Sequence, residues 1–284
     1  MIGFTKRNLL IFFRDKSAVF FSLLGVFIII GLYALFLGDV WTSEFEGMSG
    51  VRYLMDSWIM AGILAVTSVT TTMGAFGIMV DDKCKKITKD FTSSPISGSH
   101  IAGGYIASSF IIGVIMSLIT VVLAEIYIVA NGGELMNFIT LLKVIGLVLL
   151  VTFTNTSIVL FIVSFFKSAN AFATASTIIG TLIGFLTGIY LPVGQLPEAV
   201  QWVVKLFPVS HAAVLFRQVM IADAMKTSFA GAPQEAVSEF EQMMGVTFKF
   251  GDFTITPLIS IIILLVTAVV FYALSTLNIS RKKK

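Results

Sequence analysis

The sequence has few charged residues. Of its 284 residues 12% are charged and 57% are hydrophobic, whereas about a quarter of the residues in an ordinary soluble domain are charged. The mean hydropathy of +0.96 indicates that apolar residues fill the chain instead of forming one core. This composition excludes a soluble globular protein, and we expect most of the chain to lie in lipid.

Cysteine and histidine are also scarce. The single cysteine, Cys84, excludes an internal disulfide, and with only His100 and His211 beside it the chain has too few ligands for a structural zinc site. A net charge of +3 is too small to attract nucleic acid. The sequence also lacks the HExxH, G-x-S-x-G and P-loop motifs. We predict that the chain is not an enzyme by itself and holds no metal or cofactor.

Long uncharged runs are what the sequence does contain. A bilayer core needs about 20 apolar residues of helix, and six runs meet this length, with Glu125 and Lys143 near span ends. We predict an all-α membrane protein with a single transmembrane domain over residues 1–284. Its six spans should cover about residues 17–38, 57–80, 103–130, 140–166, 170–191 and 255–277.

The distribution of cations orients these spans. With a cytoplasmic N-terminus, most of the 19 Lys and Arg residues lie on the inner side, as the positive-inside rule requires. All three tryptophans then fall at the outer side, where headgroups attract them: Trp41, Trp58 and Trp202. We expect both termini to be cytoplasmic, in a bacterial cell membrane.

Three segments lie outside the spans. Residues 1–16 suit a helix in the membrane interface, although they equally suit an inward extension of the first span. The inner loop, residues 81–100, would place an apolar stripe on a short helix: Cys84, Ile87 and Phe91. This loop either only fixes orientation or docks into a groove on a cytoplasmic protein. The outer segment, residues 192–252, is interrupted by prolines and includes a short amphipathic helix that re-enters the membrane or lies on it, followed by a polar cap.

Hydroxyl side chains cluster within two spans. One run is Thr67, Ser68, Thr70, Thr71 and Thr72, and the other is Thr152, Thr154, Asn155 and Thr156. We expect most of these side chains to bond their own helix backbone or a neighbouring helix, and a minority to face a polar path.

Three stretches together resemble the permease subunits of type-2 ATP-binding-cassette exporters: RNLLIFFRDKSAVFFSLL, KCKKITKDFTSSPISGSHIAGGY and LPVGQLPEAVQWVVKLFPVSHAAVLFRQVM. In the second stretch, charged residues precede Pro95-Ile96-Ser97 and then a helix that opens with Gly103 and Gly104, which is similar to such permeases. The segment DDKCKKITKD lacks the glycine of the acidic-Arg-Gly-Thr element that the family often has.

The resemblance implies six helices per subunit, two permease subunits per pore as a homodimer or heterodimer, and a separate cytoplasmic ATPase subunit that carries ATP and Mg. It makes the inner loop a coupling helix, with ATPase-coupling residues Lys83, Cys84, Lys86, Ile87, Asp90, Phe91 and Pro95. The second and fifth spans would line the substrate pathway with Thr67, Thr70, Thr71, Met73, Thr181, Phe185 and Thr187. A re-entrant lid would contain Pro192, Pro197, Trp202 and Pro208.

The resulting prediction is a permease subunit of an ATP-driven exporter of amphipathic or hydrophobic molecules, such as drugs or lipids. The alternatives are a secondary transporter and a membrane scaffold or immunity protein. A secondary transporter usually shows ionisable residues at mid-membrane and internal repeats, and neither is evident here.

Overall fold

The chain folds almost entirely as helix. The structure, a computed structural model, describes residues 1–45, 47–93 and 96–281. It is 81% helical, and six of the described helices are long and apolar enough to cross a membrane. The prediction of an all-α membrane protein with six spans is therefore confirmed.

The six spanning helices are longer or shorter than the apolar runs that predicted them. They are α2 (Lys16–Leu32, continued by the π-helical turn η1, Tyr33–Leu37), α4 (Val51–Cys84), α6 (Gly98–Ala130), α7 (Phe138–Val163), α8 (Ala169–Leu186) and α13 (Pro257–Arg281). Helices α4 and α6 begin earlier than expected, because helical hydrogen bonding continues beyond the apolar residues. Helix α8 ends earlier than the predicted 170–191, because Gly188 adopts a left-handed conformation with φ of 68° just after it.

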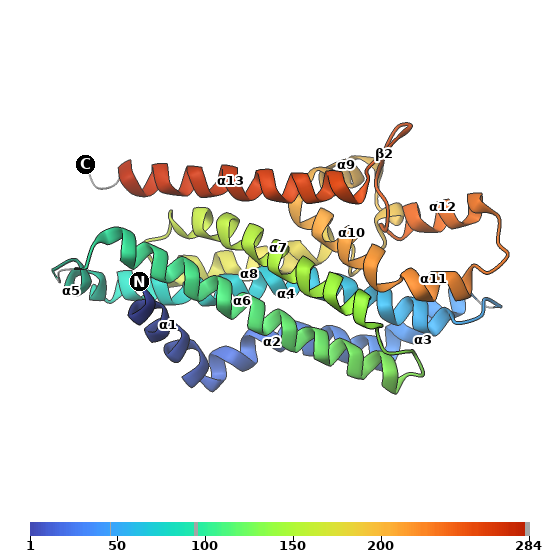
Figure 1. The fold of residues 1–284 in the computed structure, drawn as a ribbon, viewed down its shortest axis with the longest axis horizontal. Helices are drawn as coiled ribbons and strands as arrows, with labels where there is room; N and C mark the ends of the chain where they lie inside the picture. Colours follow the sequence, from blue (N-terminus) through green and yellow to red (C-terminus); the bar gives the residue numbers. More distant parts are fainter. Residues whose placement is uncertain (46, 94–95, 282–284) are drawn as a thin grey trace.

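Shorter elements connect the spans. They are α1 (Ile2–Arg14), α3 (Gly38–Glu44), α5 (Ile87–Ser93), η2 (Val193–Gln195), α9 (Glu198–Leu206), α10 (Pro208–Met220), α11 (Ala222–Ser228), α12 (Gln234–Met243), β1 (Lys249–Phe250) and β2 (Phe253–Thr254). The chain bends between α1 and α2 at Asp15, whose carboxylate caps α2 by accepting the N–H of Ala18 at 3.0 Å. Helix α1 is thus a separate helix at an angle to α2 (Figure 1).

Helix α4 forms the centre of the bundle. It packs against α2, α6, α7, α8 and α10, and Trp58, Met60 and Leu64 on it are fully buried. Its 34 residues correspond to about 51 Å of helix, which exceeds the bilayer core of about 30 Å. The N-terminus, the C-terminal end of α13 and α5 lie at one end of the molecule, called here the terminal end, and α3, α11 and α12 lie at the other, the distal end (Figure 1).

Polar side chains join the central helices. Asn155 of α7 donates to Ser68 of α4 at 3.0 Å, and Ser68 lies 3.3 Å from the hydroxyl of Thr152. Gly113 lets α6 approach the same place, because a Cβ there would lie 2.7 Å from Thr152 and 2.9 Å from Thr72. These contacts stabilise the helix packing in lipid, where the hydrophobic effect does not drive association between spans.

Candidate translocation cavity and coupling elements

Asp82 ties α1 to the terminal ends of α4 and α6. Arg7 donates from Nη1 to Oδ2 of Asp82 at 2.7 Å and from Nη2 to Oδ1 at 2.9 Å, and the hydroxyl of Tyr105 donates to Oδ2 at 2.6 Å. The Asp82 side chain is only 6% exposed. Its hydrogen bonds raise the pKa of the Arg7 guanidinium above the ordinary value, so Arg7 is charged. We call Arg7, Asp82 and Tyr105 the anchor cluster.

Helix α5 packs on this anchor cluster. The Phe91 ring meets Phe4 of α1 edge to face with centroids 5.0 Å apart, and the Arg7 guanidinium lies 4.9 Å from the centre of the Phe91 ring. Phe4 also contacts Tyr105, with centroids 4.9 Å apart. Helix α5 therefore contacts α1 and α4 directly and reaches α6 through Phe4.

The predicted stripe of Cys84, Ile87 and Phe91 does not form. Lys86, with a φ of 62°, breaks the helix between α4 and α5, so Cys84 belongs to α4, where its Sγ lies 3.5 Å from the carbonyl oxygen of Lys167. This part of the sequence prediction is wrong, because a helical stripe requires one unbroken helix.

The residues predicted to couple to an ATPase thus divide between two faces. Ile87 and Phe91 are half-buried against the protein, and Lys83 is half-buried at the end of α4. Cys84, Lys86 and Asp90 are exposed. Pro95 lies outside the residues that the structure describes.

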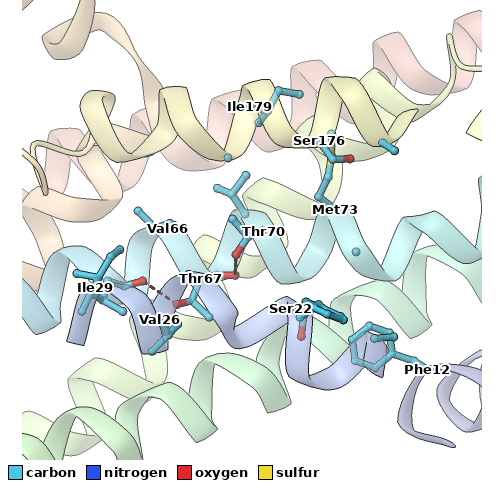
Figure 2. Close-up of a pocket in the computed structure, with 18 of the residues that line it drawn as sticks. Phe12, Ser22, Val26, Ile29, Val66, Thr67, Thr70, Met73, Ser176 and Ile179 are labelled. Atoms are coloured by element: carbon cyan, nitrogen blue, oxygen red, sulfur yellow. Dashed lines mark hydrogen bonds between the residues drawn. The ribbon is translucent and has the colours of Figure 1, made fainter. Parts of the chain in front are cut away.

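A cavity of about 460 Å³ lies between α2, α4 and α8 (Figure 2). Three of the predicted pathway residues line it from α4: Thr67, Thr70 and Met73. From α2 come Val26 and Ile29, and from α8 come Ser176 and Ile179 (Figure 2). None of the described lining residues is charged. The cavity is therefore an apolar space with a few hydroxyl groups inside the spans.

Glycine residues keep this cavity open. Gly25 of α2, Gly74 of α4 and Gly180 of α8 all line it, and a Cβ built on any of them meets no atom within 4 Å. Each of the three helices thus presents a position without a side chain toward empty space. The sequence pattern did not single out these glycines, since their common location depends on the helix packing.

The other predicted pathway residues lie elsewhere. Thr71 points away from the cavity, toward Gly113 of α6, and its hydroxyl donates to the carbonyl of Thr67 at 2.7 Å. Thr187 is buried at the end of α8 and bonds the carbonyl of Ile183 at 2.8 Å. Phe185 is exposed on α8 and contacts Tyr190, with centroids 5.0 Å apart.

Thr181 belongs to a polar stripe on the exposed face of α8. The stripe repeats at helical spacing and comprises Asn170, Thr174, Thr177 and Thr181, all of them exposed. The three threonine hydroxyls each bond the carbonyl four residues earlier, at 3.0 to 3.1 Å. We call this set the α8 stripe. Its spacing of four, three and four residues is a signal that the sequence analysis missed.

A polar groove leads toward the cavity from the terminal end. This groove of about 570 Å³ shares Phe12, Gly74 and Phe172 with the cavity. Charged residues line its wall: Arg7, Asp15, Asp81, Asp82 and Lys85. The two spaces adjoin, so an amphipathic molecule has a charged approach and an apolar destination.

A bent helix pair lies toward the distal part of the bundle (Figure 1). Helices α9 and α10 meet at 86° around Pro208, which is the first residue of α10. Pro197 caps α9 and Pro192 precedes η2, and the exposed Trp202 packs on Phe250 with centroids 5.1 Å apart. Of the predicted lid residues, Pro197 and Pro208 therefore lie at the starts of α9 and α10, Trp202 lies within α9, and Pro192 precedes η2.

We call residues 192–252 the distal cap, and a buried arginine fixes this cap to α4. Arg217 of α10 is 1% exposed; its guanidinium lies 4.4 Å from the centre of the Trp58 ring and donates to the carbonyls of Gly245 at 3.3 Å and Gly188 at 3.2 Å. Trp58 is fully buried and donates to the carbonyl of Met244 at 2.8 Å. The expectation that Trp58 contacts lipid headgroups is wrong, because the cap covers it.

These features define a multi-pass membrane protein, with an uncharged cavity among its spans and the short helix α5 at the terminal end. The family described as ABC-2 family transporter protein matches residues 37–277. The match covers most of the chain, which therefore belongs to this family and is a membrane permease component of an ABC transporter. No curated protein matches the chain. The matched region contains α4, α5 and α8 and begins after α1.

Proposed function

We propose that the chain forms half of an ATP-driven export pathway for amphipathic or hydrophobic molecules, such as drugs or lipids. The observation that carries this proposal is the cavity between α2, α4 and α8, which offers apolar walls with a few hydroxyls and, among the lining residues that the structure describes, no ionisable group to select an ion. Family membership implies an ATP-binding-cassette partner. ATP and Mg would bind on that partner, and this chain would contribute no catalytic residue.

A second permease subunit, identical or different, would complete the pathway. Helix α8 is little buried, and the α8 stripe presents an amide and three hydroxyls on its exposed face. Such a face suits a partner subunit or an aqueous path better than hydrocarbon. Thr181 would then line the path between two subunits, and Phe185 and Thr187 would lie near its distal end.

Coupling would run through α5. Exposed residues at this end, Cys84, Lys86 and Asp90, would contact the ATPase, while Phe91 transmits movement to Phe4 and Arg7. Asp82 belongs to α4, the same helix that lines the cavity. ATP-driven movement of α5 would therefore switch the cavity between inward-open and outward-open states, and the bent α9–α10 pair would act as the outer lid. In this arrangement the terminal end is cytoplasmic, α1 lies in the membrane interface, and transport is outward.

A cavity-filling substitution tests the pathway. A Cβ at Gly74 meets no atom within 4 Å, so Gly74→Leu directs its side chain into the cavity and not into packed atoms. Gly146→Leu is the matched control, because Gly146 also meets nothing within 4 Å but does not line the cavity. Both variants would be co-reconstituted with the cognate ATPase in proteoliposomes, and ATP-dependent movement of a fluorescent short-chain phospholipid and of a lipophilic dye would be measured.

The proposal predicts loss of most transport in Gly74→Leu and normal transport in Gly146→Leu, with both proteins equally stable. Equal transport in the two variants would exclude this cavity from the pathway. Dissipating the proton gradient at constant ATP distinguishes this proposal from a secondary transporter. An ATP-driven exporter continues to transport, whereas a transporter driven by the proton gradient stops. A scaffold protein would show no ligand-stimulated ATPase activity with either probe.

A further inference from the structure

A second groove lies on the surface of the helix bundle, near the distal end of α6 and the start of α7. Its volume is about 630 Å³. Val122, Ile126 and Val129 line it from α6 at helical spacing, and all three are well exposed. Leu135 of the connecting loop is also exposed along it. Since these residues belong to or adjoin membrane spans, the groove opens toward lipid.

Glu125 is the one charged residue among the described residues that line this groove. Its Oε2 accepts the backbone N–H of Met136 at 2.9 Å. Its Oε1 is buried and has no hydrogen-bond partner in the part of the chain that the structure describes. Within the same part of the chain, no Lys or Arg forms an ion pair with Glu125.

A carboxylate in a lipid-facing apolar groove is costly unless a cation or donor satisfies it. A bare metal ion would need several oxygen ligands, and no described cluster of three acidic, His or Cys residues exists. A protonated primary amine supplies both the charge and the N–H donors that Oε1 lacks. Oε1 is buried as it stands, and because the terminal torsion of a glutamate is broad, a rotation of the carboxyl group would turn this free acceptor toward a cation in the groove.

We propose that this groove binds a lipid of the surrounding bilayer whose headgroup carries a primary ammonium, with the ammonium on Glu125 and an acyl chain along Val122 and Ile126. Glu125 lies five residues before the end of α6 at Ala130, which corresponds to about 7.5 Å along the helix axis. This depth is where a span leaves hydrocarbon for headgroups. A bilayer lipid meets both requirements at once, since its amine lies at headgroup depth and its chain in hydrocarbon.

The test compares lipids that differ in the headgroup alone. The full-length protein in mild detergent is titrated with phosphatidylethanolamine, phosphatidylcholine and phosphatidylglycerol of identical acyl chains, and bound lipid is counted by native mass spectrometry. We expect phosphatidylethanolamine to bind about tenfold more tightly than phosphatidylcholine, which corresponds to about 1.4 kcal/mol and one charge-assisted hydrogen bond, because the quaternary amine of phosphatidylcholine has no N–H to donate.

Three variants locate the effect. Glu125→Gln keeps an acceptor for Met136 and removes the charge, so the preference should disappear; Glu134→Gln, an exposed acid of the next loop, should retain it. Ile126→Trp occupies the groove from an exposed position and should weaken binding with Glu125 intact, which keeps the test valid if Glu125→Gln does not fold. Equal binding of the two lipids by the unmodified protein, a preference that survives Glu125→Gln, or phosphatidylethanolamine binding that Ile126→Trp does not weaken would each overturn the proposal. The proposal would also be overturned if the protein bound free dodecylamine and did not bind phosphatidylethanolamine, because the occupant would then not be a bilayer lipid.

Discussion

The anchor cluster allows a quantitative test of how α1 is held to the bundle. The Asp82 carboxylate accepts two hydrogen bonds from Arg7 and one from Tyr105, and Asp82→Asn removes its negative charge. Charge-assisted hydrogen bonds contribute about 1.5–3 kcal/mol each when shielded from water, and breaking a buried pair costs about 3–5 kcal/mol. Because the Arg7 side chain is 29% exposed, solvent reduces the effect. We therefore expect the free energy of unfolding to fall by about 3 kcal/mol.

The neighbouring aspartate provides the control. Asp81 pairs with Lys85 at 3.4 Å, with side chains 54% and 67% exposed, so Asp81→Asn should cost less than about 0.5 kcal/mol. The assay is unfolding of the purified protein by SDS in mixed micelles. A double-mutant cycle with Arg7→Gln should give a coupling energy of at least about 1.5 kcal/mol. The reasoning is refuted if Asp82→Asn is no more destabilising than Asp81→Asn, or if the Arg7 and Asp82 substitutions are additive.

Two further substitutions and one control probe the packing of α1 and of the distal cap by the same assay. Gly104→Ala places a Cβ 2.6 Å from the Phe4 ring and should cost about 1–2 kcal/mol, whereas Gly146→Ala in open space should be neutral or slightly stabilising; equal effects would contradict the tight contact. Arg217→Lys should lower the free energy of unfolding by about 2 kcal/mol, because a lysine cannot bond the carbonyls of Gly188 and Gly245 and stack on Trp58 together. An unchanged stability of this variant would show that the guanidinium does not hold the cap.

The sequence predicted the parts of the fold that depend on long-range composition. Six apolar runs of spanning length gave six spans, because lipid requires continuous helix with internal backbone hydrogen bonds. Ends of helices were less predictable. Lys86 has no feature that announces a positive φ, yet it separates Cys84 from Ile87 and so decides which side chains share a face.

The candidate site could be predicted only in part. Thr67, Thr70 and Met73 line the cavity, because helical spacing places them on one face of α4. Thr71 does not line the cavity. One residue further along the helix is about 100° further around its axis, so the Thr71 side chain points toward α6. The contacts of Arg7 with Asp82, and of Arg217 with Trp58, join residues far apart in the chain. No local pattern contains that information, so these contacts required the folded structure.

The central claim is that α5 is the point where an ATPase attaches. Ser93, an exposed residue at the end of α5, would be replaced by the photoreactive benzoylphenylalanine in the full-length protein in its native membrane, with the exposed Glu235 of the distal cap as the control position. After irradiation, mass spectrometry identifies the covalent partner. We predict an adduct with an ATP-binding-cassette ATPase from position 93 and none from position 235. An ATPase adduct from position 235 and not from position 93 would contradict the account.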